Sequence, residues 1–225
     1  MTAYSRECVR EKIPTEVRLK PTANEPMERV ASTMLPIELL GHECALEAHA
    51  FQSRDGTEQL IVLINRTETA HPAAIPLVRI HSGCVTGDIF HSLRCDCHQQ
   101  LQSALQMITD APFGALVYIP YQEGRGIGLF KKIQAYAHQD QGLDTVDANL
   151  AVGSPVDARD YSLACEALRD LEITAIRLLS NNPDKLRELK LHGIDVVERI
   201  AMKPEPNPHN AHYLATKRQR LAHDW

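Results

Sequence analysis

Three cysteines within fourteen positions carry the clearest chemical signal in this sequence. Cys84, Cys95 and Cys97 lie in the segment CVTGDIFHSLRCDC, and a cluster of three thiolates suits zinc. A catalytic zinc site keeps one position open for water, whereas a structural site closes that position with a fourth ligand. Candidates for a fourth ligand are His81, His91 and His98. The alternative without a metal is three free thiols buried in the core.

A glycine-rich segment is a candidate anion site. Residues 122–128 read QEGRGIG and lie between an expected strand and an expected helix. Glycines at such a turn let backbone N–H groups approach a phosphate at the helix N-terminus. The segment is not a dinucleotide fingerprint, because Leu129 stands where the third glycine should be, and the chain has no Walker A sequence. A plain turn is the alternative, but Arg125 inside the segment favours an anion.

Lys185 gives independent support for an anionic ligand. It lies in the first turn of a helix that the sequence predicts after Asn182, where the helix dipole disfavours a cation. A solvated lysine at such a place is common. A bound phosphate would nevertheless account for it, since α/β proteins bind ligands at strand-to-helix turns.

Three further residues carry little signal by pattern alone. Asp157 and Arg159 flank the expected start of another helix, and an acidic residue in a first turn is ordinary capping chemistry. Tyr136 shares an apolar helix face with Leu129 and Ile133, so spacing alone predicts a core tyrosine.

The elements that must position these residues follow an α/β pattern. Runs of β-branched residues predict strands, and apolar residues at helical spacing predict helices. The expected strands are 58–66, 77–81, 115–119, 173–179 and 194–200, and the expected helices centre on 101–108, 129–137, 161–168 and 183–192. The fold class we predict is α/β, with a strand-rich N-terminal half packed on a C-terminal α/β half with a partly parallel sheet.

Composition argues against several classes of function. The net charge is -5, so no basic face is available for nucleic acid. No apolar run approaches the roughly 20 residues that span a bilayer, and the first residues hold no apolar signal core. We therefore expect a cytoplasmic protein that binds neither nucleic acid nor a membrane. In that compartment its six cysteines are thiols or metal ligands rather than disulfides.

Taken in order, several segments resemble the GTP cyclohydrolase II family. The matching segments are 79–82 (RIHS), 84–88 (CVTGD), 92–97 (SLRCDC), 122–125 (QEGR), 132–137 (KIQAYA), 139–142 (QDQG), 144–149 (DTVDAN), 178–183 (LLSNNP) and 212–217 (HYLATK). The resemblance covers residues 27–224. It implies one catalytic domain over 27–225, preceded by an N-terminal extension over 1–26.

The resemblance also implies roles for the matched residues. Cys84, Cys95 and Cys97 would hold one zinc ion, and Tyr136 would help to position the water that attacks C8 of guanine. The residues that would contact GTP are Arg79, Ile80, His81, Ser82, Gly83, Gln100, Glu123, Gly124, Arg125, Thr145, Ser180 and Lys185. Magnesium is expected on the triphosphate.

Arg159 and Asp157 match the positions of the family's nucleophile toward the α-phosphate and of its proton acceptor. Because a guanidinium is almost always protonated, an electrostatic clamp is the physically easier role for Arg159. The implied reaction is zinc-dependent opening of the guanine imidazole ring with release of formate and pyrophosphate. Its product would be 2,5-diamino-6-ribosylamino-pyrimidinone 5'-phosphate, in the first step of riboflavin synthesis, and a homodimer is expected.

The chain departs from the family pattern at several positions near the expected ligand. The departures are Gly83 for Glu, His98 for Gly, Tyr121 for Arg, Gly126 for Asn, Ala158 for Glu and Ser180 for Thr. They bear on the substrate and product more than on the reaction class. Two alternatives therefore stay open: a related cyclohydrolase with a different nucleotide or a formylated product, and a catalytically silent homologue that binds GTP.

Overall fold

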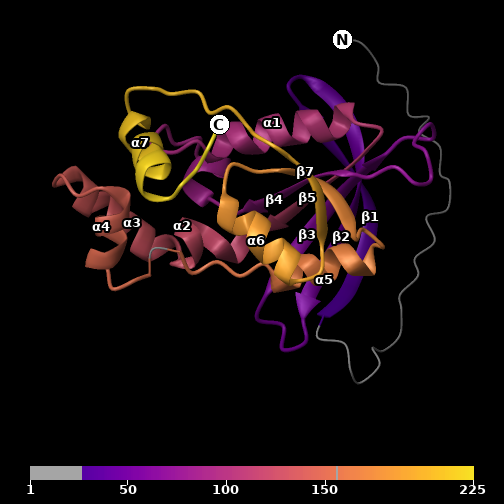
Figure 1. Cartoon of the computed structure of the whole chain (residues 1–225), viewed down its shortest axis with the longest axis horizontal. Helices are drawn as coiled ribbons and strands as arrows, with labels where there is room; N and C mark the ends of the chain where they lie inside the picture. The colour runs from indigo at the N-terminus through magenta and orange to yellow at the C-terminus, as the bar shows by residue number, and fades with distance from the viewer. Residues whose placement is uncertain (1–26, 156) are drawn as a thin grey trace, which may run out of the picture.

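The centre of the protein is a seven-stranded mixed sheet, seen in a computed structural model that describes residues 27–155 and 157–225 (Figure 1). The strands are β1 (Met27–Leu39), β2 (His42–Ser53), β3 (Gln59–Arg66), β4 (Leu77–Ser82), β5 (Phe113–Ile119), β6 (Ala175–Leu179) and β7 (Asp195–Ile200). The helices are α1 (Cys97–Asp110), α2 (Glu123–Gly126), α3 (Leu129–Asp140), α4 (Thr145–Ala151), α5 (Ser162–Asp170), α6 (Pro183–Leu191) and α7 (Ala211–Arg220).

The sheet has an antiparallel half and a parallel half. Its strand order is β1-β2-β3-β5-β4-β6-β7. The first four strands of this order pair antiparallel, and β5, β4, β6 and β7 pair parallel. The predicted fold class is therefore confirmed. The expected extension over 1–26 lies outside the described residues.

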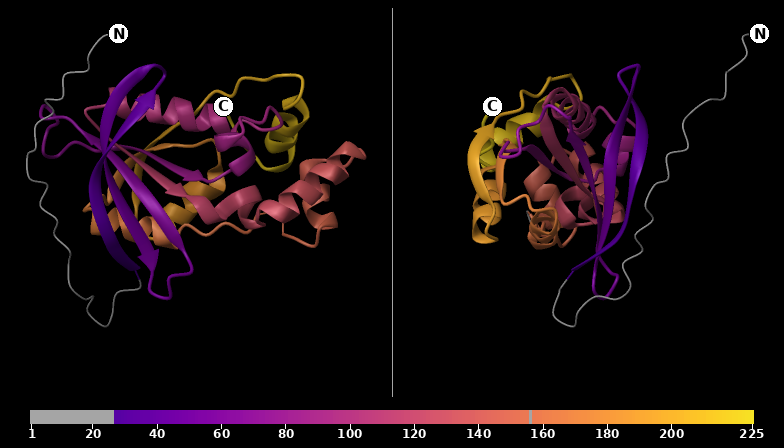
Figure 2. Two further views of the ribbon diagram at one scale, coloured as in Figure 1. Left: turned by 180° about the vertical axis from the view of Figure 1, so that it is seen from behind. Right: turned by 90° about the vertical axis from the view of Figure 1, so that its right-hand side faces the viewer.

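Apolar layers cover both faces of the sheet, because side chains alternate along each strand. On β5, Ala115, Val117 and Ile119 pack with α5 and α6 on one face. Leu116 points to the opposite face and packs with Leu105 of α1. Figure 2 shows α3 and α4 projecting beyond this layered body.

The parallel strands end at one edge of the sheet, where α/β proteins bind ligands. Ser82 at the end of β4 pairs with Ile119 at the end of β5. The cysteine segment follows β4, the glycine-rich segment follows β5, and residues 180–185 follow β6. The fold therefore gathers three chemically marked segments that are far apart in the sequence.

The helix after β6 begins as predicted. The Asn182 side chain accepts a hydrogen bond from Asp184 N at 3.0 Å, and Pro183 occupies the first position, where its missing N–H costs nothing. Gly193 then ends the segment with a φ of 78°, a left-handed conformation that suits glycine.

Two predictions about helices were wrong. On α3, Leu129 and Ile133 are exposed, whereas Lys132 and Ala135 are buried, because this helix packs its inner face on a polar site. Asp157 lies outside the first turn of α5, which begins at Ser162. Apolar spacing did not predict β1, β2, α4 or α7.

The described helices are short, and α1, with 14 residues, is the longest. Across residues 27–155 and 157–225, none has the length and apolar character that a membrane crossing requires.

Candidate active site

A pocket of about 980 Å³, counted with its solvent-filled mouth, lies at the carboxyl ends of the parallel strands. Its walls come from β4, α1, the glycine-rich segment, α3, α4, the turn after β6, and α7. The same pocket is lined by sulfurs and by cations: Cys84, Cys95, Cys97, Arg79, Arg125, Arg159, Lys132, Lys185 and Lys217.

The three cysteine sulfurs are spaced as a zinc site requires. All three Sγ atoms lie within 4.8 Å of one another, and those of Cys84 and Cys95 are 3.8 Å apart. Zinc–sulfur bonds of about 2.3 Å in a tetrahedron put neighbouring sulfurs about 3.8 Å apart. A Cβ added at Gly87 would lie 3.0 Å from each of these two sulfurs and 2.9 Å from Cys97 Cβ. Glycine therefore leaves the room that an ion needs.

Two helix starts place the cysteine side chains. Cys84 directly precedes the helical turn Val85–Ile89, and its Sγ caps that turn by accepting a hydrogen bond from Gly87 N at 3.2 Å. Cys97 begins α1.

The nearby histidines do not join the sulfur group. Within the described residues, the candidate metal group contains the three cysteines alone. His81 Nε2 lies 3.1 Å from Asp88 Oδ2, and the rings of His91 and His98 face each other with centroids 3.8 Å apart. Three sulfurs without a fourth protein ligand fit a catalytic site better than a closed structural one.

Lys132 is the cation in contact with the sulfur group. Its Nζ lies 2.9 Å from Cys84 Sγ and 2.5 Å from Glu123 Oε1. Hydrogen bonds from the Cys95 and Cys97 thiols lower the pKa of Cys84 against the effect of burial, and the Lys132 ammonium lowers it further. The Lys132 ammonium therefore favours the thiolate form of Cys84.

Tyr136 lies beside these groups on the pocket wall. Its ring centroid is 5.6 Å from Lys132 Nζ and 4.4 Å from Arg94 Cζ. Burial raises the pKa of Tyr136 to about 12. The phenol therefore stays protonated at neutral pH and can donate a hydrogen bond to a water or a substrate atom.

A buried polar network joins β4 to the cysteine segment and to α7. Arg79 donates to Leu179 O at 2.9 Å and to Gln100 Oε1. Gln100 Nε2 donates to Asp96 Oδ2 at 2.6 Å, and Lys217 Nζ donates to Asp96 Oδ1 at 2.7 Å. These bonds fix the side chains of Arg79 and Gln100, both predicted substrate contacts.

Lys185 is a buried cation with a neutral partner. Its Nζ donates to the Ile80 carbonyl at 2.7 Å. Burial holds the pKa of Lys185 well below its usual range, and the charges of Arg79 and Arg159 lower it further. An anion bound between these cations would favour the charged form of Lys185.

Asp157 and Arg159 form a two-bond ion pair, with Arg159 Nε 2.8 Å from Asp157 Oδ1 and a second bond from Nη2 to Oδ2. Burial opposes ionisation of Asp157, but the hydrogen bonds and charge of Arg159 outweigh it and lower the pKa of Asp157. The Arg159 side chain lines the pocket, held in a fixed direction by the carboxylate.

The glycine-rich segment turns through left-handed backbone, with φ values of 61°, 69° and 84° at Gly124, Arg125 and Gly126. A Cβ at Gly126 would lie 2.8 Å from Ala158 O, and Ala158 N donates to Arg125 O at 3.0 Å. Two departures from the family pattern, Gly126 and Ala158, are therefore in direct contact. This packing joins the backbone at Arg125 to the segment that holds Arg159, and both side chains line the pocket.

Most of the predicted site residues line this one pocket. They are Arg79, His81, Ser82, Gly83, Cys84, Cys95, Cys97, Gln100, Gly124, Arg125, Tyr136, Thr145, Arg159, Ser180 and Lys185. Three predicted residues do not line the pocket but contact residues that do: the Ile80 carbonyl bonds Lys185, Glu123 bonds Lys132, and Asp157 bonds Arg159.

Comparison with known protein families identifies the family of this chain. The model of the family described as GTP cyclohydrolase II matches residues 28–201, which include the sulfur group and the glycine-rich segment. The chain belongs to the GTP cyclohydrolase II family.

Curated relatives of this family agree. The chain is 44% identical over 200 residues to GTP cyclohydrolase-2 of Neisseria meningitidis, covering 89% of this chain and 98% of the relative. It is 44% identical over 198 residues to the riboflavin biosynthesis protein RibBA of Aquifex aeolicus, covering 88% of this chain and 47% of the relative. This chain thus spans about half the length of that RibBA relative.

Several pocket residues had no role in the sequence-based prediction for this GTP cyclohydrolase II family member, among them Lys132, Tyr213, Lys217 and His223. Lys132 interrupts the apolar spacing of α3 four residues before Tyr136, a placement on one helix face that signals a shared site. The C-terminal residues lie in or after the HYLATK segment, which matched the family without an assigned role.

Proposed function

We propose that this chain hydrolyses GTP, opens the guanine imidazole ring at C8 and releases formate and pyrophosphate. The product would be the ribosylamino-pyrimidinone 5'-phosphate with which riboflavin synthesis begins. One observation carries the proposal: three sulfurs spaced to hold a metal and cations from separate elements line a single pocket. A nucleotide placed across it would bring its base to the sulfurs and its phosphates to the cations. The relative named GTP cyclohydrolase-2 supports the same activity.

At the sulfur group, the three cysteines would hold one zinc ion, which supplies Lewis-acid chemistry near neutral pH when bound. The protonated Tyr136 would orient the attacking water toward C8 through its hydroxyl. Lys132 and Glu123 would hold the Cys84 side chain in place through their ion pair.

At the cationic groups, Arg125, Arg159 and Lys185 would bind the triphosphate together with magnesium. Arg159 is a guanidinium already paired with Asp157, so we assign it the role of a clamp on the α-phosphate rather than of a nucleophile. Its fixed charge would offset the charge that develops as pyrophosphate leaves. We further propose a cytoplasmic homodimer.

The test is incubation with GTP, zinc and magnesium, with formate and pyrophosphate quantified separately. The wild type should release both. Cys97→Ser should lose zinc and formate release, and Arg159→Ala should depress pyrophosphate release. Cys44→Ser, which changes a thiol outside the pocket, is the matched control and should behave as the wild type. Formate released at the normal rate by a zinc-free variant would show the mechanism to be wrong.

The mass of the product separates the two alternatives. A product that keeps the formyl group would identify a cyclohydrolase that stops at the formylated intermediate. GTP binding without either product would identify a silent homologue. Inosine and adenosine triphosphates offered in parallel would reveal a different nucleotide preference.

A further inference from the structure

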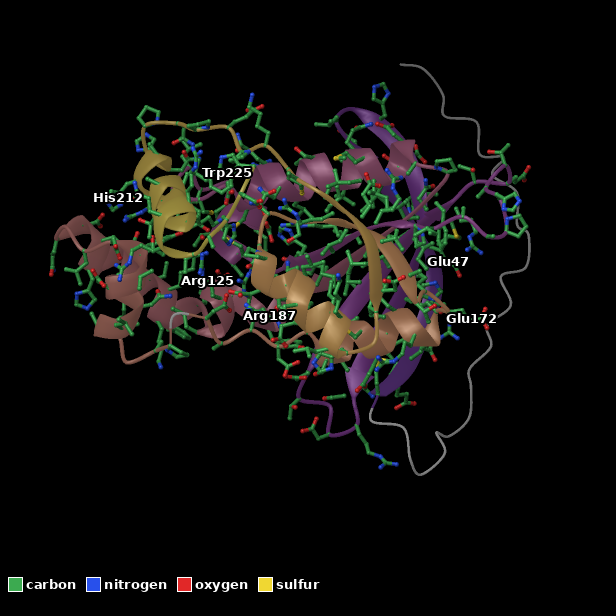
Figure 3. The ribbon with its side chains drawn as sticks, in the orientation of Figure 1. Glu47, Arg125, Glu172, Arg187, His212 and Trp225 are labelled. Carbon is green, nitrogen blue, oxygen red and sulfur yellow. The ribbon has the colours of Figure 1, made fainter. Side chains whose placement is uncertain are left out.

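The C-terminal helix contributes to the pocket although it lies beyond the segment that the family model matches. Tyr213 and Lys217 of α7 line the pocket, as does His223 after it. His212, their neighbour on the helix, is exposed and lies on the outer side of α7, away from Arg125 (Figure 3). One face of α7 therefore belongs to the site, and the other faces solvent.

Ion pairs of Lys217 and Arg220 fix the C-terminal turn of α7 over the pocket. The Lys217–Asp96 pair is almost fully buried, with side chains 8% and 2% exposed and an N–O distance of 2.7 Å. Arg220 lies 2.5 Å from Asp144 and 3.0 Å from Asp147. These bonds connect α7 to the cysteine segment and to the start of α4.

The residues after α7 are bonded to a third part of the pocket wall, the turn after β6. Arg199 of β7 pairs with Asp224, at 2.9 Å for the Nη2–Oδ2 bond, and Asp224 N donates to Asn181 O at 3.3 Å. Residues 211–224 are therefore attached to the cysteine segment, to α4 and to the turn after β6. All three of these elements line the pocket.

Tyr213 lies in the pocket wall against Lys217. Its ring centroid lies 4.4 Å from Lys217 Nζ, an arrangement in which the ammonium fixes the ring. Burial raises the pKa of Tyr213, and the nearby Cys97 and Asp96 raise it further, while Arg125 acts in the opposite sense. The hydroxyl is therefore a protonated donor in the pocket, within electrostatic reach of both a zinc ligand and Arg125.

We propose that α7 is a wall of the nucleotide site and that the Tyr213 hydroxyl donates a hydrogen bond to an oxygen of GTP between guanine C8 and the triphosphate. Lys217 is a positioning residue, since it orients the Tyr213 ring and neutralises Asp96. This inference rests on the proposed function, because it assumes that GTP spans the pocket from the sulfurs to the cations.

The first test is Tyr213→Phe, which removes the hydroxyl and keeps the ring. A lost hydrogen bond to a substrate oxygen should weaken binding of a GTP analogue with a methylene between the α and β phosphorus atoms by about tenfold. Zinc content and melting temperature should stay as in the wild type. His212→Ala on the outer face of the same helix is the matched control and should bind the analogue normally. Equal affinities of Tyr213→Phe and His212→Ala would overturn the proposal.

Lys217 is tested by a pair of variants in the same binding assay. Lys217→Met should weaken analogue binding as Tyr213→Phe does, and Lys217→Arg, which keeps the charge, should restore it. If Lys217→Met fails to fold because Asp96 is left unpaired, the double variant Asp96→Asn/Lys217→Met replaces it. Normal analogue affinity in a folded Lys217→Met protein would overturn the positioning role. Failure of the proposed function is distinguishable, because the wild type itself would then release no formate.

Discussion

The space beside Gly83 is filled in this protein by its neighbours. A Cβ there would lie 3.0 Å from Pro120 Cα and 3.1 Å from both Ile119 O and the Tyr118 hydroxyl. Tyr118 in turn donates to Asp88 Oδ2 at 3.0 Å. The glutamate that the family usually carries at this position would therefore not fit without movement of the β5 end. Glycine at position 83 therefore removes a charge and also fits the close packing of its neighbours.

Gly83→Ala should accordingly destabilise the fold. Two of the three close contacts are to backbone atoms, which cannot rotate away, and overpacking of this kind costs about 1–3 kcal/mol. Urea denaturation should show a lower midpoint with an unchanged slope. Tyr118→Phe removes the hydroxyl contact and also the hydrogen bond to Asp88, so it serves as the reference: adding Gly83→Ala to Tyr118→Phe should still lower the midpoint. An unchanged midpoint in Gly83→Ala would show that the neighbouring backbone yields easily.

Lys132 should matter for zinc affinity rather than only for the fold. Three thiolates give a zinc site a net negative charge, and the ammonium 2.9 Å from Cys84 Sγ offsets it and fixes that ligand. Lys132→Met should weaken zinc binding by about 10–100-fold, the usual range for a residue that supports a metal ligand. Competition with a chromophoric chelator measures this directly.

The matched control is Lys131→Met on the same helix, whose Nζ bonds Ser154 Oγ at 3.0 Å and stays outside the sulfur group. It should keep wild-type zinc affinity. Because Lys132→Met also leaves Glu123 without its cation, the comparison is repeated with Glu123→Gln/Lys132→Met. Wild-type zinc affinity in both Lys132 variants would rule out the supporting role.

At the scale of elements, sequence periodicity predicted those that cover the hydrophobic core. The spacing on α1 and α5 matches side chains that are buried in the structure, such as Ile108 and Leu168. It failed for β1, most of whose residues are exposed, and for α7, which buries Thr216 and Lys217. Hydrophobic patterns carry no information about a face that is turned to solvent or to a polar pocket.

The same limit applies to the candidate site. The cysteine group was predictable because its members lie within fourteen positions of one another. The Lys217–Asp96 pair joins residues 121 positions apart, and no local sequence pattern predicts it. Family resemblance supplied the expected substrate contacts, and only the folded chain shows that Glu123 contacts Lys132 and that Asp157 contacts Arg159.

The segment after α7 should make stability sensitive to acid. Burial, together with the charges of Lys217, Arg125 and Arg159, lowers the pKa of His223 to about 3. The folded state then holds this imidazole neutral, while the unfolded state takes up a proton near the ordinary pKa of 6.5. Because the unfolded state binds more protons than the folded state below that value, the free energy of unfolding decreases as the pH falls from 6.5 toward 3.

The melting temperature of His223→Gln should therefore fall less than that of the wild type when the pH is lowered from about 7 to about 5. The matched control is His209→Gln, an exposed histidine of the same C-terminal segment, which should follow the wild type. Identical acid sensitivity of all three proteins would show that His223 does not contribute.

For the whole molecule, the pocket is assembled from one chain. Every wall, from the cysteine segment to α7, comes from the residues described here. A second copy can bind on a surface outside these walls. The outer faces of α3 and α4, which project from the body, provide one (Figures 1 and 2).

The projecting helices expose apolar side chains that the rest of the described chain does not cover. Phe130 is 87% exposed, Leu150 55% and Ile133 50%. Large apolar side chains gathered on one projecting pair of helices are typical of a protein interface. We therefore expect α3 and α4 to form the interface of the proposed homodimer.

Phe130→Asp tests this expectation, because a charge buried in an interface opposes association. Light scattering and sedimentation velocity should show a dimer for the wild type and a shift toward monomer for the variant. Leu191→Asp, which changes a 74% exposed leucine at the end of α6, is the matched control and should stay dimeric. Because the pocket walls come from one chain, the Phe130→Asp monomer should keep its zinc. A monomeric wild type would contradict the dimer, and a Phe130→Asp dimer as stable as the wild type would place the interface elsewhere.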